Sequence, residues 1–142
     1  MVVNSRVISK GTQVWRRRKC LKCGGLYTTY EGINLSFLVV VKKSGRRQRY
    51  NRAKIYTSIY HSFLDKKNVD RGQTSVEAQE ITDRVERLIL ARKKREISTA
   101  EIMEIIMTLL KKKAPDSLLR YVAYRKGSDP AEVKRVIKKY FG

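Results

Sequence analysis

Short apolar pieces separated by turn residues fill the first quarter of the chain. They are rich in the β-branched and aromatic side chains that favour strands, and glycines interrupt them at Gly11 and at Gly24-Gly25. The pieces are residues 2–3, 7–8, 14–15 and 27–30. They bury too little apolar area to hold a fold alone, so a module of this kind normally needs a metal ion or a partner. The pattern predicts a small, turn-rich sheet within residues 1–33.

A β-hairpin is predicted next. Its strands are residues 35–41 and 47–50, and the turn between them, residues 43–46, contains Gly45. A helix should follow at once, because Asn51 is a good N-cap and apolar residues then recur every four positions at Ile55, Ile59 and Phe63. We place this first helix at residues 52–64.

The second helix is predicted to open at a capping box formed by Thr74 and Glu77, after a loop over residues 66–73. Its apolar residues recur at helical spacing: Val76, Ile81, Val85, Leu88 and Ile89. The charged residues between them alternate in sign, which is typical of a solvated helix face: Glu77, Glu80, Asp83, Arg84, Glu86 and Arg87.

Three further helices complete the predicted set. The third opens at a capping box of Ser98 and Glu101, and its apolar stripe is Ile102, Ile105, Ile106, Leu109 and Leu110. A fourth helix begins at Pro115, which suits a first helical turn. A fifth opens at Asp129 and ends near Tyr140.

Strands followed by helices predict an α+β fold. We expect a β-rich arm at residues 1–33, a β-hairpin lid over a helical bundle at residues 34–126, and a basic C-terminal helix at residues 127–142. The apolar face of that last helix would pack on the bundle or on a second subunit, whereas its lysines would add DNA affinity in the competing interpretation.

The charge balance points to a polyanionic partner. The chain has 33 Lys and Arg against 13 Asp and Glu, a formal net charge of +20, which favours nucleic acid binding. Residues 1–64 hold 14 of these bases and a single acid, Glu31. No stretch approaches the roughly 18 apolar residues of a membrane helix and no signal peptide is recognisable, so we expect a cytoplasmic protein without membrane contact.

Seven basic residues gather on the predicted hairpin and the first turn of its helix: Lys42, Lys43, Arg46, Arg47, Arg49, Arg52 and Lys54. Helix N-termini and basic side chains both favour phosphate oxygens, so this region is a candidate phosphate site. The alternative is a solvated hairpin with ordinary surface charge. No glycine-rich phosphate loop and no acidic metal ligand accompanies the hairpin, so phosphoryl transfer is not predicted.

The two cysteines, Cys20 and Cys23, form a C-x-x-C pair, which favours metal or redox chemistry over a structural disulfide. A structural zinc takes four ligands, and the only histidine, His61, falls on the predicted first helix. Another chain could complete the site, the sheet could fold without metal, or it could stay partly disordered. A redox role is the remaining alternative, because Lys19 and Lys22 would lower thiol pKa values.

Residues 41–54, VKKSGRRQRYNRAK, resemble the opening of an ATP-cone. Upstream, NSRV at residues 4–7, RRRKCLKCG at residues 16–24 and TTYE at residues 28–31 resemble the second half of the zinc ribbon in NrdR transcriptional repressors. Downstream, Arg120-Tyr121 and Tyr124-Arg125 resemble the closing helix of the cone. The resemblance covers roughly residues 4–126.

In the NrdR family the cone binds ATP or dATP, nucleotide choice changes the oligomeric state, and the ribbon binds promoter DNA to repress ribonucleotide reductase genes. The resemblance implies that Val41 and Lys42 meet the adenine and that Lys43, Arg46 and Lys54 lie near the phosphates. It also implies a DNA-binding set: Arg16, Arg17, Arg18, Lys19 and Lys22. For that strand, purely non-specific affinity is the competing interpretation.

The resemblance is incomplete at the metal, because the family has two C-x-x-C knuckles and this chain has one. The missing knuckle would precede Asn4, which implies a shortened chain or an internal start. Gly32 also stands where the family more often has a base. Without catalytic residues we expect no enzyme but a homo-oligomeric regulator. The rivals are a stand-alone ATP-cone with a degenerate ribbon, serving as a regulatory interaction module, and a nucleic acid binder without nucleotide sensing.

Overall fold

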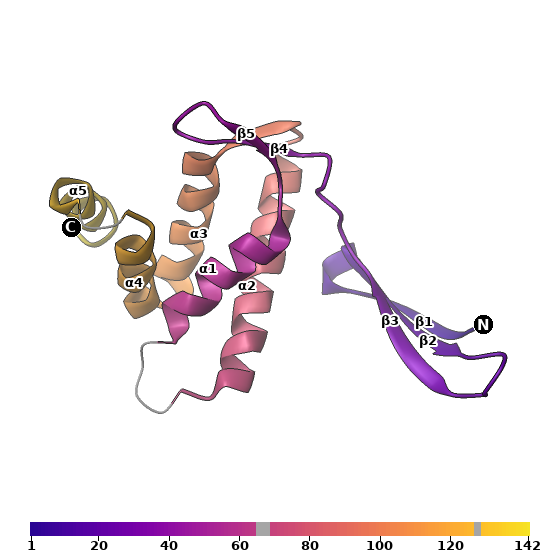
Figure 1. The fold of residues 1–142 in the computed structure, drawn as a ribbon. Helices are drawn as coiled ribbons and strands as arrows, with labels where there is room; N and C mark the ends of the chain where they lie inside the picture. Colours follow the sequence, from indigo (N-terminus) through magenta and orange to yellow (C-terminus); the bar gives the residue numbers. More distant parts are fainter. Residues whose placement is uncertain (65–68, 127–128) are drawn as a thin grey trace. The chain divides into compact units, whose positions relative to one another are not determined.

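The computed structural model describes residues 1–64, 69–126 and 129–142, and the chain divides into two compact units, residues 1–35 and residues 36–142 (Figure 1). The first unit is a three-stranded sheet. The second combines a small sheet with five helices in its described part. The predicted α+β class is confirmed. No helix among the residues described is both long and apolar enough to cross a membrane.

The N-terminal sheet contains β1 (Val2–Ile8), β2 (Gln13–Lys19) and β3 (Leu26–Glu31), antiparallel and adjacent in that order. A 3-10 turn, η1 (Ser9–Gly11), joins the first two strands. The β2–β3 turn is closed by the Gly24 N–H, which donates to the Cys20 carbonyl at 3.0 Å, and Gly24 adopts φ 72°, a region open to glycine. The predicted turn-rich sheet is therefore confirmed, with its turns at the expected glycines.

The second sheet has the order β5-β4-β6, formed by β4 (Val39–Val41), β5 (Arg47–Arg49) and β6 (Glu96–Ser98). Strands β4 and β5 form the predicted hairpin, although the first strand is shorter than expected, because residues 35–38 are not in a strand. Strand β6 pairs with β4 in parallel and was not predicted. Its three residues carry no local strand signal, since their partner lies about 57 positions away in the sequence.

Five helices follow in the predicted order: α1 (Arg52–Phe63), α2 (Arg71–Ala91), α3 (Thr99–Lys113), α4 (Pro115–Lys126) and α5 (Pro130–Phe141). The Asn51 side chain caps α1 by accepting from the Ala53 N–H at 2.9 Å. The predicted capping box of Ser98 and Glu101 is present at α3. Figure 1 shows the β4–β5 hairpin lying across one end of this helical bundle.

The start of α2 was predicted wrongly. Asp70, not Thr74, is the N-cap, because its carboxylate accepts from the Gly72 N–H at 2.8 Å and the Gln73 N–H at 3.3 Å. Thr74 is buried inside the first turn, where its hydroxyl donates to the Asp70 carbonyl. The predicted loop over residues 66–73 therefore ends earlier, and its first part lies outside the described residues.

The core of the second unit lies between the helices. Its fully buried members include Leu38, Ile59, Ala78, Ile81, Val85, Ile106, Leu110, Leu118, Tyr121 and Val122. On α2 the predicted apolar face was partly wrong, because Val76 and Leu88 are 58% and 45% exposed, whereas Thr82 and Glu86 are buried. Packing against α1 and α3 selects this face, and Glu86 is tolerated there because it accepts a hydrogen bond from the buried Tyr50 hydroxyl and pairs with Arg52.

Candidate functional site

A cavity of about 700 Å³ opens beneath the β4–β5 hairpin. The hairpin forms one wall, and the starts of α1 and α3 form others. Apolar side chains line it through Val40, Ile55, Ile102 and Met103, beside the basic residues Lys42, Lys43, Lys54 and Arg125. Among the described residues, the starts of two helices and four basic side chains thus border the cavity, an arrangement that favours an anion bearing an apolar group.

Four of the five predicted nucleotide-binding residues line this cavity: Val41, Lys42, Lys43 and Lys54. Strand β4 and the turn position the first three, while the cap at Asn51 starts α1 so that Lys54 lies in its first turn. The Lys54 ammonium lies 3.5 Å from the Gln48 amide oxygen. Arg46 is exposed on the hairpin turn and is not among the lining residues.

Two charged lining residues were missed as site residues, Arg125 on α4 and Glu132 on α5. Arg125 belongs to a pair that resembles the closing helix of the cone, but nothing in the sequence linked that pair or Glu132 to the hairpin, because the packing of the last two helices brings them there. Glu132 is the one acid among the described residues that line the cavity, and its Oε1 lies 3.9 Å from the Lys43 Nζ. The cavity thus includes a carboxylate that the hairpin sequence alone does not supply.

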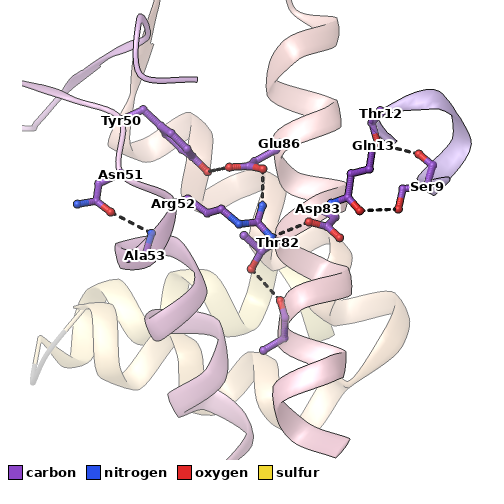
Figure 2. Close-up of polar contacts among 11 residues, drawn as sticks. Ser9, Thr12, Gln13, Tyr50, Asn51, Arg52, Ala53, Thr82, Asp83 and Glu86 are labelled. Atoms are coloured by element: carbon purple, nitrogen blue, oxygen red, sulfur yellow. Dashed lines mark hydrogen bonds and ion pairs between the residues drawn. The ribbon is translucent and has the colours of Figure 1, made fainter. Parts of the chain in front are cut away.

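Tyr50, which lines the cavity, belongs to a partly buried polar cluster with Arg52, Asp83 and Glu86 (Figure 2). The Tyr50 hydroxyl donates to Glu86 Oε1 at 3.1 Å, and Arg52 donates to Glu86 and, at 2.6 Å, to Asp83. Burial raises the pKa of the Glu86 carboxyl, which the Arg52 charge opposes. The prediction of a solvated face on α2 was therefore wrong at these two acids, which tie α2 to the start of α1.

The strand pairing of the first unit separates the predicted DNA-binding residues. Successive side chains of a strand point to opposite faces, so Arg16 and Arg18 share one face and Arg17 and Lys19 share the other. Arg16 Nη2 lies 3.3 Å from Glu31 Oε2, and Arg18 Nη2 lies 3.6 Å from Glu31 Oε1. The hydrogen bond from Arg16 lowers the pKa of Glu31.

The other predicted DNA-binding side chains lie apart from this ion pair. Arg17 Nη1 donates to the Thr28 hydroxyl at 3.3 Å. Lys22 is exposed in the β2–β3 turn beside Cys23. All five therefore belong to β2 and the turn that follows it, but they do not form one surface.

Comparison with known proteins gives a family match for each of the two units. Residues 38–129 match the family model of the ATP cone domain, and residues 1–31 match the model described as Transcriptional repressor NrdR-like, N-terminal domain. The chain is 36% identical over 142 residues to a Transcriptional repressor NrdR of Bordetella petrii, covering 99% of this chain and 87% of that protein. It is 37% identical over 138 residues to one of Clostridium botulinum, covering 96% and 88%.

The chain belongs to the NrdR family of transcriptional repressors. The resemblance expected from the sequence is thereby confirmed over nearly the whole chain. Since NrdR proteins are repressors, a non-enzymatic family, the expectation that the chain is no enzyme is confirmed as well.

The zinc implied by the NrdR ribbon does not fit within the described part of one chain. Cys20 is half-buried and Cys23 exposed, both as free thiols, and hydrogen bonds from the backbone of Cys23 and Lys22 lower the pKa of Cys20. No group of three or more His, Cys, Asp and Glu able to hold a metal occurs among the described residues. His61 lies on α1 and stacks on Tyr124, with ring centroids 6.0 Å apart. Two thiols supply half of a tetrahedral site.

Proposed function

We propose that the chain is a repressor that binds duplex DNA through its N-terminal sheet and senses an adenine nucleotide, ATP or dATP, in the cavity beneath the hairpin. The observation that carries this proposal is the cavity itself, which lies within the residues matched by the ATP cone domain and joins apolar walls to four cations. An adenine ring suits the apolar part, and a polyphosphate suits the basic part.

Within the cavity, Val41 and Lys42 are assigned to the adenine, and Lys43 and Lys54 to the phosphates. The position of Lys54 supports this assignment, because a cation in the first turn of α1 adds to the N–H groups at the helix start. Arg46 does not line the cavity, so it would reach a phosphate only if the turn at residues 42–46 moved inward.

DNA binding is assigned to the N-terminal sheet, whose basic residues are concentrated on β2 and the turn that follows it. Lys and Arg that neutralise phosphates release counterions, so the affinity should fall steeply with salt. Nucleotide in the cavity would bias self-association of the chain, and the oligomer would decide whether several basic sheets engage neighbouring DNA sites together. By its family the repressor would act in the bacterial cytoplasm on ribonucleotide reductase genes.

The test is a calorimetric titration of the full chain with ATP and with dATP, comparing Lys54→Ala with Lys112→Ala. Lys112 is exposed near the end of α3 and does not line the cavity, so it is a control for the lost charge. We expect Lys54→Ala to weaken nucleotide binding about tenfold, since a charge-assisted contact contributes on the order of 1.5 kcal/mol. Equal nucleotide affinity in the two variants would contradict the assignment of Lys54 to the phosphates.

DNA binding by the same preparations is measured at two salt concentrations, with and without nucleotide. Salt-steep binding that responds to nucleotide supports the repressor. Nucleotide binding without DNA binding at low salt would instead favour a stand-alone ATP-cone.

A further inference from the structure

The N-terminal sheet has two chemically different faces. In antiparallel pairs, directly opposed residues lie on the same face, so the register assigns every side chain of β2 and its neighbours to one side. One side, called here the Trp15 face, carries Arg6, Trp15, Arg17, Lys19, Thr28 and Tyr30. The other, called the Glu31 face, carries Ser5, Arg16, Arg18, Thr29 and Glu31.

The two faces differ in charge. The Trp15 face holds three cations, Arg6, Arg17 and Lys19, and no acid. On the Glu31 face the two arginines share one carboxylate, so the net charge is smaller and a negative group stands among the donors. Phosphates approaching the Glu31 face would have to compete with Glu31 for both guanidinium groups.

The side chains of the Trp15 face are also held in place across the strands. The Arg6 guanidinium carbon lies 5.8 Å from the centroid of the Trp15 ring, a cation–π contact between β1 and β2. The Thr28 hydroxyl accepts from one of the five N–H donors of Arg17, which orients the guanidinium. Arg17 and Lys19 are two positions apart on one strand, so their Cα atoms lie roughly 6.6 Å apart along it.

We propose that the Trp15 face is the surface that lies against duplex DNA and that Arg16 and Arg18 are positioning residues which brace β2 against β3 through Glu31. This inference rests on the proposed DNA binding and gives the three arginines of β2 two different roles. Arg17 contacts the duplex, and Arg16 and Arg18 stabilise the strand that presents it. Charge complementarity favours duplex DNA as the ligand of the Trp15 face, because three cations on one face match the negative charge of a phosphate backbone.

A matched pair of variants tests the assignment on the full chain. Arg17→Gln and Arg16→Gln each remove one positive charge from the same strand, so their long-range electrostatic effect on DNA binding is equal. Any difference between their DNA affinities therefore reports direct contact of one side chain with the duplex. At about 0.15 M salt we expect Arg17→Gln to bind duplex DNA about tenfold more weakly and its salt slope to fall by about one contact, whereas Arg16→Gln stays within about threefold of the parent. Equal losses, or a larger loss in Arg16→Gln, would overturn the face assignment.

Glu31→Gln gives a second, opposite test. If the Glu31 face were the DNA surface, removal of its carboxylate would release two arginines and strengthen binding about tenfold or more. On the proposed assignment the gain stays within about threefold.

Trp15 provides a readout that needs no substitution, because it is the only tryptophan in the chain. We expect duplex DNA to shield its fluorescence from acrylamide, and unchanged quenching in the bound state would contradict the proposal even if a variant failed to fold. If the parent chain does not bind DNA at low salt, the proposed function fails; if it binds but the Arg16 and Arg17 variants behave alike, only the face assignment fails.

Discussion

At the scale of single residues, Arg52 is a side chain on which several others depend. Its guanidinium donates to Glu86, which is 5% exposed, and to Asp83, so its removal leaves two carboxylates without their shared cation. Tyr50, which lines the cavity, donates to the same Glu86. The cluster therefore supports the cavity wall as well as the packing of α1 on α2.

We predict that Arg52→Gln lowers the free energy of unfolding by about 2 kcal/mol, because the remaining buried carboxylate loses a charged partner while solvent still reaches the site. Urea denaturation of the variant measures this loss. Arg49→Gln is the matched control, since Arg49 is exposed on β5, and it should change the unfolding free energy by less than about 0.5 kcal/mol. Equal stabilities would show that the cluster contributes little.

A second prediction concerns Glu132, whose carboxylate occupies the cavity assigned to phosphates. Glu132→Gln should bind ATP about threefold more tightly, because it removes a negative charge near Lys43. Glu104→Gln removes the same charge from an ion pair with Lys139 outside the cavity lining, at 3.0 Å, and should leave the affinity unchanged. Weaker binding in Glu132→Gln would show instead that the carboxylate assists the nucleotide.

At the scale of elements, α3 depends on its capping box. Hydrogen bonds from the Ser98 backbone N–H and from Lys94 hold the pKa of Glu101 at about 2, below its ordinary value of 4.5. A lowered folded-state pKa means that the ionised carboxylate stabilises the fold fully above pH 4.5 and loses this effect as the pH falls toward 2.

Glu101→Gln should accordingly lower the unfolding free energy by about 1 kcal/mol at pH 7. The difference from the parent should shrink between pH 4.5 and pH 2 in chemical denaturation followed by circular dichroism. Glu104→Gln, three positions along the same helix, has no capping role and should show no such pH dependence. A gap between Glu101→Gln and the parent that persists at pH 2 would contradict the capping account.

Elements with their own local signals could be predicted from the sequence, and those that depend on distant partners could not. The caps at Asn51 and Ser98 act within one turn, so α1 and α3 were placed correctly. Strand β6 forms only because β4 lies beside it. The start of α2 was misplaced because Thr74 and Asp70 offer competing caps, and the carboxylate of Asp70 is in reach of two N–H groups.

Only part of the candidate site could likewise be predicted from the sequence. Its three lysines, Lys42, Lys43 and Lys54, lie on the hairpin and the first turn of α1, so their pattern is visible in the sequence. Arg125 and Glu132 reach the cavity through the packing of α4 and α5 and have no comparable pattern. For the DNA-binding strand, composition identifies the basic residues, but only the register between strands separates Arg17 from its neighbours.

At the scale of the whole molecule, the division into two units predicts separable functions. The helical core lies in residues 36–142, whereas the three-stranded sheet belongs to residues 1–35. We expect a fragment of residues 36–142 to fold, to keep nucleotide binding within about threefold, and to lose most of its affinity for duplex DNA, because the proposed DNA surface is absent. Circular dichroism, calorimetry and a DNA titration measure these three properties, and full DNA affinity in the fragment would refute the division.

Strand β4 has a neighbour on each edge, and this limits how the hairpin can move. Thr99, the first residue of α3, also donates through its hydroxyl to the Val41 carbonyl at 3.3 Å. The other neighbour, β5, belongs to the hairpin itself, so the hairpin is attached through β6 and Thr99, and closure over a ligand must carry β6 and the start of α3 with it. That helix is a rod of 15 residues, roughly 22 Å long, whose far end meets α2 where Lys113 pairs with Glu80 at 2.6 Å. Binding of a ligand in the cavity would thereby shift α3 as a whole and change its contact with α2 at the opposite end of the bundle.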